Sequence, residues 1–187
     1  DSKKLTSLDL SNFNTFKVIY MNNMFYNCTS LTKLNLNSFD TSKVVNMNGM
    51  FWECSNLTSI NISNFNTSKV TDMNNMFAEC SNLITLDLSN FDTSNVIYMG
   101  NLYSYSYGGM FRNCSSLKEL NVSSFNTSKV KYMSNMFQGC SSLTTLDLSN
   151  FNTSNVTAMA SMFDSCTNLK NLNLSSFDTS NVTDMSF

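Results

Sequence analysis

Apolar and polar residues alternate along this chain on a schedule that repeats every 26 residues. Within the copy at residues 28–53, Leu34 and Leu36 flank a polar residue. This period-two alternation predicts a short strand over residues 33–37. Identical strands one repeat apart would pair in register as a parallel sheet, with about 4.8 Å between neighbours.

The second half of the repeat has a different spacing. The segment Val44-x-x-Met47 predicts a second short strand, and Met50-Phe51-x-x-Cys54 has the spacing of a single helical turn. The side chains expected to point inward are Leu31, Leu34, Leu36, Phe39, Val44, Met47, Met50, Phe51 and Cys54. Ordering the backbone costs about 1–2 kcal/mol per residue, so one copy cannot fold alone and must stack on its neighbours.

A period of this length predicts a solenoid. The 187 residues hold about seven copies, so we expect one α/β repeat solenoid over residues 1–187. Its parallel sheet would form one face, and the second strand and helical turn would form the other. The fourth copy is longer, because an insertion rich in Tyr, Ser and Gly lies at residues 100–109. Both terminal copies would expose apolar edges, which favours a fragment of a longer repeat array.

The composition argues against several classes of function. The net charge is −2, and no apolar run approaches the roughly 20 residues of a membrane span, so we expect neither nucleic-acid binding nor membrane insertion by this segment. Proline is absent, so corners such as Asp40-Thr41-Ser42 would be held by side chains that bond the turn backbone. Histidine is absent too, and each acidic or nucleophilic column recurs as a ladder. An active site is normally a unique constellation, so we expect no enzyme and no cofactor.

The cysteines form one column of the repeat. They are Cys28, Cys54, Cys80, Cys114, Cys140 and Cys166. Stacking would place neighbouring Cα atoms about 5 Å apart, which allows three disulfides. The alternative is a ladder of free, buried thiols that act as small apolar residues. We favour the free thiols, because each cysteine follows a Met-Phe pair of the predicted core. Without Cys-x-x-Cys or histidine, no metal site is expected.

The insertion is the best candidate for a binding site. Tyr103, Tyr105 and Tyr107 alternate with serine, and Tyr98 and Tyr132 occupy one column in consecutive copies. Insertions in solenoids map to loops that often form a binding face, and Tyr with Ser combines contact area with adaptable hydrogen bonding. These tyrosines predict a contact surface for a protein or a sugar. The alternative is a tolerated loop that packs its tyrosines onto the coil.

The complete repeat resembles a known family. Leu-x-x-Leu-x-Leu is similar to the leucine-rich repeat. The whole unit, Cys-x-x-Leu-x-x-Leu-Asx-Leu-x-x-Phe-Asx-Thr-Ser-x-Val-x-x-Met-x-x-Met-Phe, resembles the BspA-like leucine-rich-repeat surface proteins of bacteria, in their methionine-rich, lipoprotein-associated branch. The likeness covers residues 2–185 apart from the insertion. One departure is Phe39 and its equivalents, which stand where ordinary leucine-rich repeats often have asparagine.

The resemblance implies a right-handed solenoid, extracellular or cell-surface display and, for some members, adhesion to host matrix proteins. We therefore expect a non-catalytic module that adheres to a protein or glycan at a microbial cell surface. Neighbouring repeats of the same polypeptide would be its other contacts. The alternative function is a passive spacer, stalk or filament-forming repeat protein.

Overall fold

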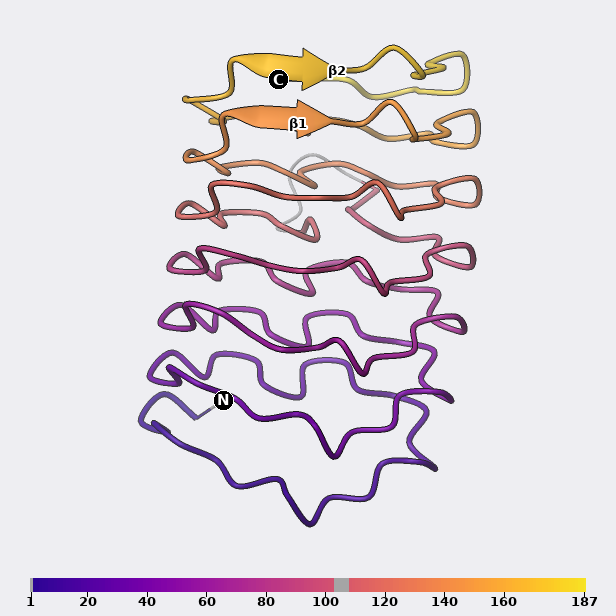
Figure 1. The fold of residues 1–187 in the computed structure, drawn as a ribbon. Coiled ribbons are helices and arrows are strands. Elements are labelled where there is room, and N and C mark those ends of the chain that lie inside the picture. Colours follow the sequence, from indigo (N-terminus) through magenta and orange to yellow (C-terminus); the bar gives the residue numbers. More distant parts are fainter. Residues whose placement is uncertain (1, 103–107) are drawn as a thin grey trace.

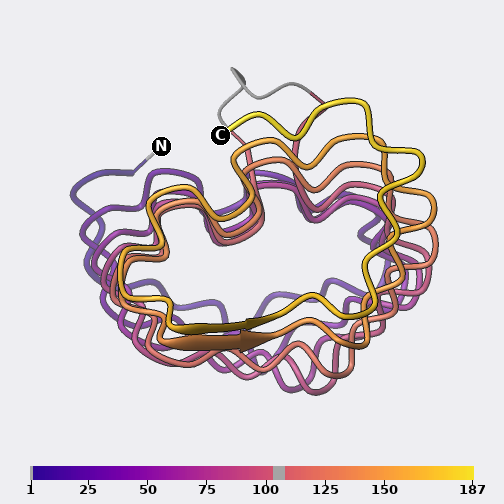
Figure 2. The same cartoon turned by 90° about the horizontal axis from the view of Figure 1, so that it is seen from above.

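The chain folds as a stack of similar coils. The computed structural model describes residues 2–102 and 108–187, and the coils succeed one another along a single axis (Figure 1). Viewed along that axis, successive coils lie over one another as one flattened ring (Figure 2). The expected repeat solenoid is confirmed at this level.

Its core is the set of inward columns predicted from the sequence. In the second coil every member of that set, from Leu31 to Cys54, is at most 8% exposed. Phenylalanines stack along the axis in one column, namely Phe25, Phe51, Phe77, Phe111, Phe137 and Phe163. Their ring centroids lie 5.5–6.0 Å apart. Such aromatic pairs contribute about 0.5–1.5 kcal/mol each beyond the burial of their area.

The leucine face forms less sheet than predicted. Strand β1 (Thr145–Asp147) pairs in register and in parallel with strand β2 (Asn171–Asn173). These two strands lie in the last two coils at the C-terminal end (Figure 1), and the rest of the described residues contains no further strand. The expectation of a sheet across all coils was therefore wrong in extent.

Side chains bond the backbone just after the leucine segment. In the second coil the N–H of Asn37 donates to Oδ1 of Asn35, two residues earlier, at 3.0 Å. From the next coil, Nδ2 of Asn64 donates to the carbonyls of Leu36 and Phe39 at 3.1 and 2.8 Å. Short polar side chains thus bond the turn that follows the leucine segment, and the equivalent contact of the Ser149 N–H with Asp147 occurs at β1 as well.

The methionine face holds the coils together through the backbone. Every second N–H of one coil donates to a carbonyl of the next coil at 2.9 Å: Met47 to Asp72, Gly49 to Asn74, Phe51 to Met76 and Glu53 to Ala78. The same spacing recurs along the stack. Each pair of adjacent coils is therefore joined by several parallel bonds on this face.

The predicted helical turn over Met50–Cys54 was wrong, and the described residues contain no helix. The intervening N–H groups of Met50 and Cys54 bond three residues back, to Met47 and Phe51. Gly49 and Glu53 have positive φ, +62° and +61°, which breaks a helical path. The helical spacing reflected consecutive turns whose alternate N–H groups point to the next coil.

The predicted second strand is reduced to isolated parallel bridges. They join one residue per coil in the order Tyr20, Asn46, Asp72, Tyr98, Tyr132, Ala158 and Asp184. We call these residues the bridge column. It lies just before the methionine segment, so its members are held in register across the whole stack.

We had expected the corner threonines to bond within their own turn, but they bond to the next coil instead. Thr93 Oγ1 donates to the carbonyl of Asn126 at 2.9 Å and accepts the N–H of the same residue at 2.8 Å. Equivalent contacts join Thr15 to Asp40 and Thr41 to Asn66. Each hydroxyl therefore replaces a pair of ladder bonds at the corner.

Replacing Thr93 by valine is expected to lower the free energy of unfolding by about 2–4 kcal/mol. Valine keeps the shape but removes the part-buried partner of the N–H and the carbonyl of Asn126, and an unsatisfied group of this kind costs about 1–3 kcal/mol. Thr93→Ser, which keeps the hydroxyl, should retain most of the stability. Urea unfolding followed by circular dichroism measures the difference. Thr58→Val, on an exposed threonine, is the control, and equal effects of Thr93→Val and Thr58→Val would contradict the bridging role.

Candidate tyrosine surface

The bridge column differs from the structural columns in one respect, which is that its residue changes from coil to coil. The columns that hold the stack repeat the same residue, as Cys, Phe and Thr do. The bridge column instead carries Tyr, Asn, Asp, Tyr, Tyr, Ala and Asp. Stacking fixes the backbone of this column, but its side chains vary from coil to coil. These side chains can therefore contribute to the specific recognition of a ligand without disturbing the stack.

Two predicted site residues meet in this column. Tyr98 and Tyr132 are joined by a parallel bridge, and their rings stack with centroids 5.2 Å apart and planes 20° apart. Tyr98 is 42% exposed, and Tyr132 is half-buried. The pair therefore presents a rigid aromatic edge to solvent. Its backbone is held in place by the hydrogen bonds that join adjacent coils on the methionine face.

The insertion leaves and rejoins the coil directly beside this pair. Gly100 and Gly109 form an antiparallel bridge, and Asn101 pairs with Ser134 of the next coil. Asn74 donates a 2.6 Å hydrogen bond to Oδ1 of Asn101. The predicted residues Tyr103, Tyr105 and Tyr107 lie outside the described residues. The described residues at the base of the insertion, 100–102 and 108–109, form its stem and nevertheless show that it begins beside Tyr98.

The stem is closely packed, which explains its glycine. A Cβ added to Gly108 would lie 2.3 Å from the side-chain amide of Asn101. No real Cβ approaches a heavy atom so closely, so another residue at position 108 would displace Asn101 and its bond to Asn74.

Sequence reasoning missed a polar cluster next to the tyrosines. Asp72 accepts hydrogen bonds from Nδ2 of Asn46 at 3.4 Å, from Nδ2 of Asn48 at 3.2 and 3.3 Å, and from the N–H of Asn74 at 2.9 Å. Burial raises the pKa of the Asp72 carboxyl, and these hydrogen bonds partly offset that effect. Comparing the bridge column between copies would have found the cluster, because an acid replaces an amide there.

The cysteine column has a structural role. All six cysteines are free thiols, and all but Cys166 are buried. Each of five thiols donates to a phenylalanine carbonyl of the preceding coil at 3.0–3.2 Å: Cys54 to Phe25, Cys80 to Phe51, Cys114 to Phe77, Cys140 to Phe111 and Cys166 to Phe137. Burial is the main cause that raises the pKa of these thiols, to about 12 for Cys54. A protonated, buried thiol is a poor nucleophile.

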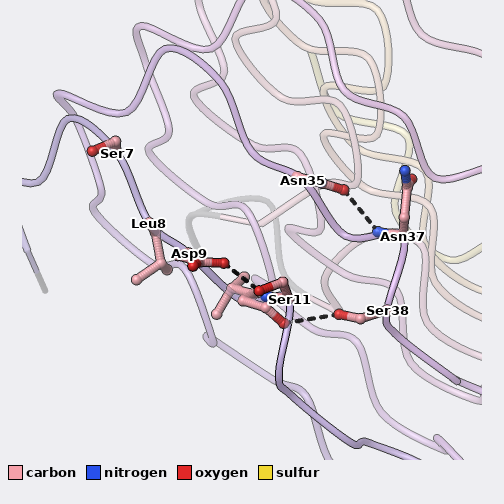
Figure 3. A pocket seen from close by; sticks show the side chains of 8 residues that line it. Ser7, Leu8, Asp9, Ser11, Asn35, Asn37 and Ser38 are labelled. Carbon is pink, nitrogen blue, oxygen red and sulfur yellow. Dashed lines mark hydrogen bonds between the residues drawn. The ribbon is translucent and has the colours of Figure 1, made fainter.

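An open hollow of about 570 Å³ lies against the first two coils. Its lining is Ser7, Leu8, Asp9, Leu10, Ser11, Asn35, Asn37 and Ser38 (Figure 3). The polar groups there already bond to one another: Asp9 accepts the N–H of Ser11, and Ser38 donates to the carbonyl of Leu10. These are the same turn contacts that recur in later coils, so the hollow is part of the repeat.

Neither a metal-binding cluster nor a membrane-spanning helix is present in the described residues, 2–102 and 108–187. This part of the chain has no cluster of three or more histidine, cysteine, aspartate or glutamate residues that could hold a metal ion. It also contains no helix of the length and apolarity needed to cross a membrane.

Together these features define a repeat solenoid with one interrupted repeat. The chain belongs to the family described as "Mycoplasma protein of unknown function, DUF285", whose profile matches residues 1–108 and again residues 105–187. No curated protein matches the chain. Among solved structures it is similar to a chain of the "Crystal structure of TLR13-ssRNA13 complex", with 21% identity and a TM-score of 0.35. That similarity covers 89% of this chain but 23% of the other.

Proposed function

We propose that this chain is a non-catalytic binding module that attaches to a protein or glycan outside a microbial cell. Its contacts are the tyrosine surface, which we define as Tyr98 and Tyr132 with Tyr103, Tyr105 and Tyr107 of the insertion. The resemblance to BspA-like surface proteins supports display at the cell surface and adhesion as the role.

The observation that carries the proposal is the stacked pair Tyr98–Tyr132 beside the stem of the insertion. The Cys, Phe and Thr columns that hold the stack are largely buried, whereas Tyr98 is 42% exposed. Tyrosines provide large, rigid contact area at a low entropic cost, and they are frequent in binding surfaces. The insertion begins in the same coil, and its sequence contains three more tyrosines.

A passive spacer or filament is the second candidate. The uniformity of the coils favours it, because each coil forms the same backbone and threonine bonds with its neighbour. A spacer of this kind needs no specific surface, so the variable bridge column would have no role in it.

Binding of the immobilised chain to a panel of matrix proteins and glycans separates the two candidates. We expect at least one panel member to bind, and we expect Tyr98→Ser with Tyr132→Ser to weaken it about tenfold or more. Replacing Tyr103, Tyr105 and Tyr107 together by serine tests the insertion. The matched control is Tyr26→Ser, a half-buried tyrosine of another column. If no member of the panel binds the chain, the spacer function is favoured.

A further inference from the structure

Five consecutive coils place a mixed aromatic and polar row along the solenoid axis. We call this row the axial strip; its members are Tyr20, Asn46, Asp72, Tyr98 and Tyr132. Parallel bridges hold each member in register with the next, so neighbouring positions lie about 4.8 Å apart. The strip is one residue wide and about 19 Å long, which suits an extended chain better than a compact ligand.

The ends of the strip are aromatic and accessible. Tyr20 is 67% exposed at one end, and the stacked pair Tyr98–Tyr132 forms the other. Each ring has an apolar body and a polar hydroxyl tip. A ligand that lies along the strip would therefore meet an apolar ring and a hydroxyl at both ends.

The middle of the strip is polar and already oriented. Asn46 and Asp72 lie between the aromatic ends, and Asn48 braces the carboxylate from the side. The three amide-to-carboxylate contacts are long, 3.2–3.4 Å, and thus weaker than the best hydrogen bonds. A ligand hydroxyl can replace one of them, because it both donates to the carboxylate and accepts from the amide.

Sugar chains have the chemistry that this row would recognise. A hexose with equatorial hydroxyls has apolar C–H groups and a rim of hydroxyls, which matches tyrosine rings at both ends of the strip with an amide and a carboxylate between them. The strip contains no cation, so nothing in it selects an anionic sugar. A protein partner typically buries about 800 Å² on each side, more area than a row one residue wide supplies.

We propose that the axial strip binds an extended oligosaccharide of neutral, equatorially hydroxylated hexoses that lies parallel to the solenoid axis. This inference rests on the proposed binding function and names its ligand class. The exposed edges of the Tyr98–Tyr132 pair contact sugar C–H groups and hydroxyls, Tyr20 receives the far end, and Asp72 with Asn46 bonds hydroxyls between them.

Isothermal titration of the complete chain with a β-1,4-linked glucose hexasaccharide tests the proposal. We expect saturable binding, and we expect glucose itself to bind at least about tenfold more weakly because it contacts one part of the strip. Tyr98→Ala should weaken hexasaccharide binding about tenfold or more, and Tyr20→Ala should weaken the hexasaccharide but not a disaccharide. Tyr26→Ala is the matched control, and unfolding curves of every variant check the fold.

Three results would overturn the inference. One is no heat of binding at millimolar hexasaccharide, and another is hexasaccharide binding that Tyr98→Ala and Tyr20→Ala leave unchanged. The third is capture of a matrix protein through Tyr98 and Tyr132 without any oligosaccharide binding. That third result would leave the proposed binding function intact and reject its ligand class, so the two failures are distinguishable.

Discussion

Replacing Phe77 by alanine is expected to lower the free energy of unfolding by about 3–5 kcal/mol. Phe77 is fully buried and stacks on Phe51 at 5.5 Å and on Phe111 at 6.0 Å. Alanine would remove both contacts and leave a cavity between coils whose spacing is fixed by backbone bonds, so the site cannot collapse to fill it. The effect should be large because stacking against neighbouring coils is the main source of stability in a solenoid.

Urea unfolding followed by circular dichroism and by fluorescence of Trp52 measures this loss. Trp52 is the single tryptophan and lies one coil from Phe77, so it reports on the same part of the stack. Phe16→Ala is the control, because Phe16 is 44% exposed in the first coil and should cost about 1 kcal/mol or less. A similar loss for both variants would show that the phenylalanine column is not the core that we describe.

The folded chain should lose stability steeply as the pH rises above about 9. Burial raises the pKa of Cys54 from its ordinary value of 9.0 to about 12, and it raises the pKa values of Cys80 and Cys114 well above 9.0. These thiols stay protonated in the fold, whereas in the unfolded chain they ionise near their ordinary pKa. Their contribution is therefore complete below pH 9 and is lost as the pH rises toward the folded pKa. One pKa unit corresponds to about 1.4 kcal/mol, so Cys54 alone accounts for a loss of about 4 kcal/mol by pH 12.

Urea unfolding at pH 7, 9, 10 and 11 with a reductant present checks this dependence. The difference in stability between the parent chain and Cys54→Ala should shrink as the pH rises, because the variant lacks the titrating thiol. Cys166→Ala is the matched comparison, since Cys166 is less buried and its pKa is raised less decisively. Parallel stability curves for the parent chain and Cys54→Ala would contradict the role of the buried thiols.

The sequence predicted the core but not how the backbone between core residues would bond. Leu36, Met50 and Phe51 are buried as expected, because an apolar residue that recurs at the same place in every coil is shielded from water by facing the core. The helical turn after Met47 was wrong, because spacing cannot tell a helix from turns whose N–H groups point to the next coil. The sheet was overestimated, because period-two alternation predicts which side chains face the core and not whether the backbones of adjacent coils pair as a ladder.

The candidate site was predicted only in part. Placing Tyr98 and Tyr132 in one column identified an aromatic pair, and the structure adds that their rings are stacked and partly exposed. Asp72 was missed, because only the tyrosines of its column were compared between copies. The polar cluster around it depends on Asn46 and Asn48, which belong to the preceding coil and meet it only when the coils are stacked.

By itself, the sequence determined that the chain is a solenoid, which columns face the core and which copy carries the insertion. A fixed 26-residue period places equivalent residues in columns along the axis, and the apolar columns then face the core. The tertiary structure decided which face holds the coils together, how the corner threonines bond and which polar groups surround the tyrosines. Those features are contacts between neighbouring coils, where backbone and side chains compete for the same partners, and the outcome depends on their distances.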